Sequence, residues 1–94
     1  MTWMRIEDVF TIDGRGPVIT GRVQGGPIRP GDQLWLMSDS DPVAAITVVH
    51  VGGFCLRGTQ ADAAGPGDNA GLLIAGVEAS QIHIGQVVTD AVPG

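Results

Sequence analysis

Glycine and proline interrupt this chain at short intervals, and the interruptions restrict it to short strands. The 94 residues include 15 glycines and six prolines. The apolar runs between them are rich in valine and isoleucine, which suit a pleated sheet better than a helix. The strands expected from this pattern cover residues 3–12, 18–24, 33–37, 43–51, 70–75 and 86–89, with pairing resumed over 54–57.

Three turns share one design without forming a true repeat. Residues 28–32, 64–68 and 82–86 each place a glycine and a polar residue just before an apolar run. Glycine adopts backbone angles that other residues resist, so each segment predicts a sharp entry into the next strand. One helical turn is expected near Ser80, where Glu78 and Gln81 lie close by.

Several short strands with almost no helix predict an all-β sandwich or barrel. A chain this small avoids exposed sheet edges best by closing on itself. We therefore predict a single domain over residues 1–94, folded as a small closed antiparallel barrel. Aromatic residues make up only 4% of the chain, so its core must consist mainly of aliphatic side chains.

The charge of the chain argues against several kinds of partner. The formal net charge is −5, and all five cationic residues are arginines. A protein that binds a DNA duplex gathers positive charge along one face, which this composition does not supply. The chain has no lysine, so it cannot contain the P-loop lysine of a nucleotide-hydrolysing site. We expect no binding to duplex DNA and no GTPase activity, whereas contact with a tRNA end stays open.

The sequence predicts a soluble, cytoplasmic protein without a membrane partner. Its single cysteine, Cys55, cannot form an internal disulfide and suits a reducing compartment. The N-terminal residues lack a signal-peptide pattern, and no apolar run reaches membrane-spanning length.

No group of residues forms a recognisable catalytic or metal-binding motif. Glu7 and Asp8 are neighbours on an expected strand, so their carboxylates should point to opposite faces rather than at one substrate. His50 and His83 have no companion ligand at metal-binding spacing. Cys55 has no adjacent base in sequence and is interpreted as a buried, inert thiol. We expect a protein that is not an enzyme and that uses no metal or other cofactor.

Two long segments resemble the second domain of elongation factor Tu and its translation-GTPase relatives. They are "IEDVFTIDGRGPVITGRVQGGPIRPGDQL", residues 6–34, and "GPGDNAGLLIAGVEASQIHIGQVVT", residues 65–89. The resemblance implies a six-stranded Greek-key barrel of the type shared by reductases, isomerases and elongation factors. The stretch 52–65 departs from the family by being longer and richer in glycine. Neither the GTPase domain nor the third domain of such factors is present in these 94 residues.

In elongation factor Tu, this domain helps to hold the aminoacyl end of a charged tRNA. By resemblance, Glu7 and Asp8 match the acidic pair of that pocket, Phe10 its aromatic residue, Thr20 its threonine and Asn69 its asparagine. A carboxylate can accept hydrogen bonds from an α-amino group, and an aromatic ring can support an apolar or stacked part of the ligand. The alternative is that these residues persist only as inherited parts of the barrel.

One further position, Arg15, matches the arginine of the family's first hairpin turn. It lies at the expected hairpin tip, from which it can reach phosphate or a neighbouring domain.

The alternation of residues 34–37 suggests a second surface. If Leu34 and Leu36 face the core, Trp35 and Met37 face outward, where an exposed apolar pair is a candidate protein interface. Trp3 extends that surface from the N-terminal side. The alternative is that the segment 52–65 or the N-terminus covers it.

Taken together, these features predict a non-catalytic binding module that contacts a protein partner or a second copy of itself. The alternative is a translation-related role, in which it binds the aminoacyl end of tRNA or ribosomal RNA. Met1 and the short end at Pro93 and Gly94 suggest a complete small product. A domain of a larger factor is the competing interpretation.

Overall fold

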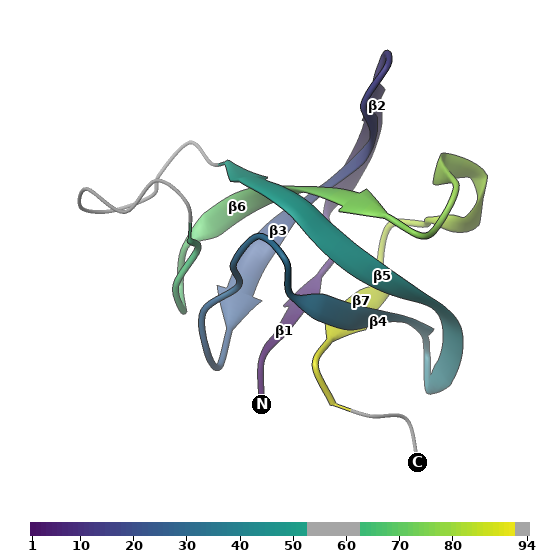
Figure 1. Ribbon diagram of the computed structural model, residues 1–94. Coiled ribbons are helices and arrows are strands. Elements are labelled where there is room, and N and C mark those ends of the chain that lie inside the picture. The colour runs from purple at the N-terminus through teal and green to yellow at the C-terminus, as the bar shows by residue number, and fades with distance from the viewer. Residues whose placement is uncertain (53–62, 92–94) are drawn as a thin grey trace.

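The computed structural model describes residues 1–52 and 63–91, which form an antiparallel barrel (Figure 1). Its seven strands and one short 3₁₀ helix are β1 (Trp3–Arg5), β2 (Asp8–Ile12), β3 (Gly16–Gln24), β4 (Gln33–Ser38), β5 (Asp41–Gly52), β6 (Asn69–Ala75), η1 (Ala79–Gln81) and β7 (Val87–Thr89).

Six of these strands close the barrel in the order β1-β7-β4-β5-β6-β3, because β1 also pairs with β3. All the pairings are antiparallel. β2 pairs with the other half of β3 and forms a hairpin that extends beyond the barrel (Figure 1). The meander β4–β5–β6 lies between β3 and β7, so the predicted closed six-stranded Greek-key barrel is confirmed.

The single strand predicted over residues 3–12 is wrong, because the chain changes partners near Ile6. The Ile6 N–H donates to the Gln86 carbonyl at 2.8 Å, and the Ile6 carbonyl accepts from the Gly85 N–H at 2.9 Å. The chain rejoins β3 at the next residue, where the Glu7 N–H donates to the Thr20 carbonyl at 2.8 Å. This exchange divides the segment into β1 and β2.

The three predicted turns adopt one geometry. In the first, Gly31 has a φ of 93°, and Asp32 Oδ2 accepts a hydrogen bond from the Arg29 N–H at 2.9 Å. In the same way, Asp68 Oδ2 accepts a hydrogen bond from the Gly65 N–H at 2.9 Å, and Gln86 Oε1 accepts one from the His83 N–H at 2.6 Å. In each turn the glycine N–H also donates to a carbonyl outside its own turn, that of Val48, Val23 or Ile6.

The predicted helical turn is also present. Residues Ala79–Gln81 form the 3₁₀ helix, and Glu78 and Gln81 form its capping box. The strand pairing predicted over 54–57 lies outside the described residues, as does the predicted environment of Cys55. No helix in the described residues is long and apolar enough to cross a membrane.

The barrel interior is filled by aliphatic side chains from every strand of the ring. Leu34 and Leu36 are buried, as the alternation of β4 predicts. The core cluster consists of Met4, Ile6, Ile19, Val23, Ile28, Leu34, Leu36, Ile46, Val48, Val51, Ala64, Ala70, Leu72, Ile74, Ile82 and Val88.

Closure of the barrel depends on a close approach at Gly21. A Cβ atom at this buried position would overlap the carbonyl oxygen of Arg5 and would lie 3.0 Å from Cγ of Met4. The backbone of β1 can therefore cross β3 here only because glycine has no side chain.

We predict that Gly21→Ala lowers the free energy of unfolding by about 1–3 kcal/mol, the usual cost of overpacking a core. Gly52→Ala is the matched control, because a Cβ atom at Gly52 meets no atom of the described residues within 4 Å. Urea unfolding followed by circular dichroism measures both variants. Equal stability of Gly21→Ala and the parent chain would show that β1 does not need this contact.

Candidate functional site

A row of apolar side chains crosses the outer surface of the barrel from β2 to β5. Phe10 is paired with Val18, Val18 with Leu73, and Leu73 with His50. Paired residues on neighbouring strands project from the same face. Phe10 is 47% exposed, while Val18 and Leu73 are buried. In this row the two middle side chains, Val18 and Leu73, are buried, and Phe10 and His50 lie at its two ends.

The next row lacks side chains at two of its four positions. Asp8 is paired with Thr20, Thr20 with Gly71, and Gly71 with Gly52. Because Gly71 and Gly52 have no side chains, the surface of the sheet is recessed beside Val18 and Leu73. A hollow of about 250 Å³ results, and Phe10, Ile12, Arg15, Thr20 and His50 also line it. We call this hollow the apolar slot.

A smaller hollow adjoins the slot at Thr20. It measures about 180 Å³ and is lined by Glu7, Thr20, Gly21, Asn69 and Ala70. The Glu7 carboxylate and the Asn69 amide are both exposed groups, so a ligand can reach them from solvent. We call this hollow the acidic hollow. It combines a negative charge with a side chain that can both donate and accept hydrogen bonds.

The structure brings together most of the residues predicted for the aminoacyl pocket. Glu7, Thr20 and Asn69 line the acidic hollow, and Phe10 and Thr20 line the apolar slot. Asp8 lines neither hollow, and its Oδ1 accepts a hydrogen bond from the Val9 N–H at 2.8 Å. The two neighbouring carboxylates are thus separated in position, and only Glu7 faces the acidic hollow.

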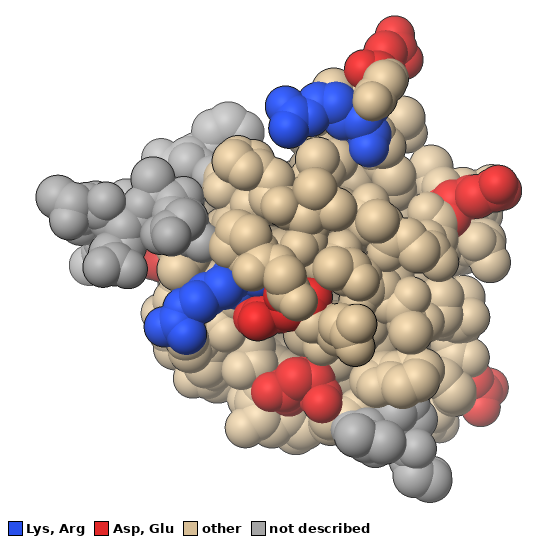
Figure 2. All heavy atoms as spheres, in the orientation of Figure 1, with Lys and Arg blue, Asp and Glu red and all other residues tan. Residues whose placement is uncertain are grey.

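Arg15 lies at the turn of the β2–β3 hairpin, as the sequence predicts. Its N–H donates to the Ile12 carbonyl at 2.9 Å, and its side chain is exposed and lines the apolar slot. Charged side chains on the face in Figure 2 are scattered, and the described residues form no continuous basic strip there.

The three predicted interface residues lie on one outer face, formed by β1, β7 and β4. Trp3 and Trp35 are both paired with Thr89, from opposite sides. Thr89 lies between these two tryptophan positions and is only 8% exposed, and its hydroxyl donates a hydrogen bond to the Thr2 carbonyl at 3.1 Å. In the next row, Val87 is paired with Met37. We call Trp3, Trp35, Met37, Val87 and Thr89 the tryptophan face.

Exposure on the tryptophan face is smaller than the sequence suggests. Trp3 is 36% exposed, whereas Trp35 and Met37 are half-buried between their strand neighbours. Most of the segment expected to cover this face, residues 53–62, lies outside the described part of the chain.

Sequence reasoning missed several residues that shape the slot. From the sequence alone, His50 is considered only as a metal ligand, and no role is assigned to Leu73 or Gly71. The signal that unites them is the strand register, because Gly71 and Gly52 become neighbours only when β5 pairs with β6. Among the described residues, no group of three or more His, Cys, Asp or Glu side chains could hold a metal ion.

Comparison with known proteins identifies the family of this barrel. The family model for elongation factor Tu domain 2 matches residues 16–89. The chain belongs to the elongation factor Tu domain 2 family. This elongation factor Tu domain 2 barrel is also similar to translation elongation factor SelB from Methanococcus maripaludis, in its apo form. The two share 28% sequence identity with a TM-score of 0.73 over 94% of this chain, which corresponds to 18% of the SelB chain.

We predict that the two tryptophans of the domain 2 barrel differ in their access to solvent. In the Trp35→Phe variant the fluorescence comes from Trp3, and in the Trp3→Phe variant it comes from Trp35. Iodide should quench the more exposed Trp3 more strongly, with free N-acetyltryptophanamide as the reference for full exposure. Stronger quenching of Trp35 would contradict the arrangement of the tryptophan face.

Proposed function

We propose that this elongation factor Tu domain 2 barrel is a non-catalytic binding domain that holds the aminoacyl end of tRNA. The observation that carries the proposal is that the apolar slot and the acidic hollow meet at Thr20. The first suits a flat, weakly polar group, and the second suits a cation. An aminoacylated terminal nucleoside has both groups in adjacent positions.

The base of such a nucleoside fits the apolar slot. Val18 and Leu73 form its floor, and the Phe10 ring is exposed enough to contact a planar ligand. Stacking of a base on an aromatic side chain contributes about 1–3 kcal/mol. Arg15 at the rim can approach a phosphate of the same nucleotide.

The α-amino group fits the acidic hollow. At neutral pH this group carries positive charge when protonated, and the Glu7 carboxylate can accept its hydrogen bonds. Asn69 can bond to the ester or to the amino group through its amide. Uncharged tRNA lacks this ammonium, so the hollow provides a physical basis for distinguishing acylated from free tRNA ends.

We predict that aminoacyl-tRNA binds more tightly than uncharged tRNA and that Glu7→Gln removes most of this difference. A hydrogen bond to a charged group contributes about 1.5–3 kcal/mol, so the affinity for the acylated form should fall at least about tenfold. Titration at low salt measures both ligands.

The matched control for this experiment is Glu78→Gln. This variant removes the same negative charge at the 3₁₀ helix, and the amide oxygen of the new glutamine can still accept the capping hydrogen bond. Phe10→Ala should weaken both tRNA forms, because it removes the stacking surface rather than the ammonium contact. Failure to bind either form at high protein concentration would refute the proposal.

The tryptophan face supports a second candidate function, a contact with a protein or with a second copy of the chain. Trp3, Trp35, Met37 and Val87 together place apolar area on an outer surface. Aromatic residues and methionine are enriched at protein interfaces. This candidate and RNA-end binding use different faces and are tested separately.

For self-association, we predict a concentration-dependent rise in sedimentation coefficient that Met37→Glu abolishes. The new carboxylate would be desolvated in an interface, whereas Val49→Glu, at an exposed residue of β5 away from this face, should have little effect. A monomer at every concentration, with both tryptophans shielded from iodide, would count against this second candidate.

A further inference from the structure

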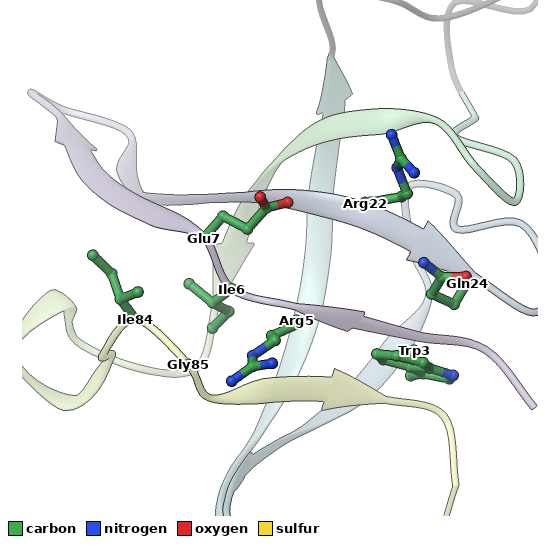
Figure 3. A pocket seen from close by; sticks show the side chains of 8 residues that line it. All are labelled: Trp3, Arg5, Ile6, Glu7, Arg22, Gln24, Ile84 and Gly85. Carbon is green, nitrogen blue, oxygen red and sulfur yellow. The ribbon is translucent and has the colours of Figure 1, made fainter.

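A third hollow opens where β1 and β3 separate (Figure 3), and it has a volume of about 570 Å³. The two strands are paired at Trp3 with Gln24 and at Met4 with Val23. After Arg5 the chain turns aside to bond with residues 85 and 86, and it rejoins β3 only through the Glu7 N–H. The hollow thus results directly from the change of partner that divides β1 from β2.

Two arginines line opposite sides of this hollow. Arg5 comes from β1 and Arg22 from β3, and both side chains are exposed. In Figure 3 the Arg5 side chain extends from β1 toward the Gly85 segment, whereas the Arg22 side chain extends from β3 in the opposite direction. In a chain with a net charge of −5, two of its five arginines are concentrated here.

An indole and an amide complete the hollow. Trp3 is 36% exposed and is paired directly with Gln24, and Figure 3 shows the two side chains at the same end. An exposed indole provides a stacking surface for a nucleic-acid base, with little dependence on which base it is. The Gln24 amide can donate to or accept from the edge of that base.

We propose that this hollow, the arginine hollow, binds one nucleotide of a single-stranded RNA. The base stacks on Trp3, and the phosphates on its two sides contact Arg5 and Arg22. The guanidinium group suits phosphate because its planar array of donors matches two phosphate oxygens. Glu7, which also lines the hollow, can accept a hydrogen bond from a ribose hydroxyl.

An acidic peptide fits the arginine hollow less well. The Glu7 carboxylate would repel additional carboxylates, and such a peptide has no flat group to cover the indole. The site goes beyond the proposed aminoacyl-end function, because Glu7 is the one side chain that it shares with the acidic hollow and its other side chains are different.

The test uses an adenosine tetranucleotide RNA and the Trp35→Phe chain, whose remaining tryptophan is Trp3. The RNA should quench Trp3 fluorescence at low salt. Replacing both arginines, Arg5→Gln with Arg22→Gln, should weaken binding at least about tenfold, given the strength of hydrogen bonds to charged groups. The negative slope of log K against log salt should also become shallower by about 1.4, since each phosphate contact to a single strand contributes about −0.7 to it.

The matched control is Arg29→Glu, which makes the same change of two charge units at an exposed residue outside the three hollows. Its binding should stay close to that of the parent. Adenosine monophosphate, with one phosphate, should bind more weakly than the tetranucleotide. Absence of Trp3 quenching, an equal loss in Arg29→Glu, equal binding of the monophosphate, or displacement by an oligoglutamate peptide would each overturn the proposal.

Gly71→Ala separates this proposal from the aminoacyl-end function. The added methyl group would lie 3.6 Å from Val18 Cγ1, an ordinary contact, and would partly fill the apolar slot. It should reduce binding of the acylated end and leave quenching of Trp3 by the tetranucleotide unchanged. Loss of Trp3 quenching in Gly71→Ala would show that the RNA occupies the slot and would refute a separate arginine hollow.

Discussion

The barrel depends on three turns in which a glycine and a polar side chain act together. The glycine adopts a φ between 88° and 98°, which leaves its N–H free to bond a carbonyl outside its own turn. The side chain of the residue after this glycine, Asp32, Asp68 or Gln86, accepts a hydrogen bond from the backbone N–H at the start of the turn. Each turn thereby satisfies its own backbone and attaches to another part of the barrel. A small chain with few aromatic residues gains order from such turns as well as from its core.

The same constraint shapes the outer surface. Closing six short strands requires close backbone approaches, and Gly21 provides one where β1 crosses β3. The chain changes partner directly after that crossing, beyond Arg5, and the arginine hollow opens there. On the opposite side of β3, Gly71 and Gly52 lower the surface and form the apolar slot. The candidate binding sites are therefore products of how the barrel closes rather than additions to a finished fold.

The sequence predicts the parts of this structure that depend on neighbouring residues. The turns, the alternation that buries Leu34 and Leu36, and the capped turn at Glu78 are local, and the structure confirms them. The break at Ile6 was missed, because its hydrogen-bond partners come from residues 85 and 86, far along the chain. Family resemblance located Glu7 and Asn69, but composition and spacing did not. Nothing in the linear sequence indicates that Arg5 and Arg22 share a hollow, because their proximity arises from strand register.

Glu7 connects the proposed sites, because it lines both the acidic hollow and the arginine hollow. Glu7 is thus shared by the hollow proposed for an ammonium group and the hollow that Arg5 and Arg22 line. A phosphate bound to Arg5 and Arg22 would neutralise those cations and leave more of the Glu7 charge for an α-amino group. Occupation of the two hollows would then be mutually favourable, and this coupling would be reciprocal. If both proposed ligands bind, a carboxylate at this shared wall would give the small barrel a physical means of linking RNA contact to recognition of an acylated end.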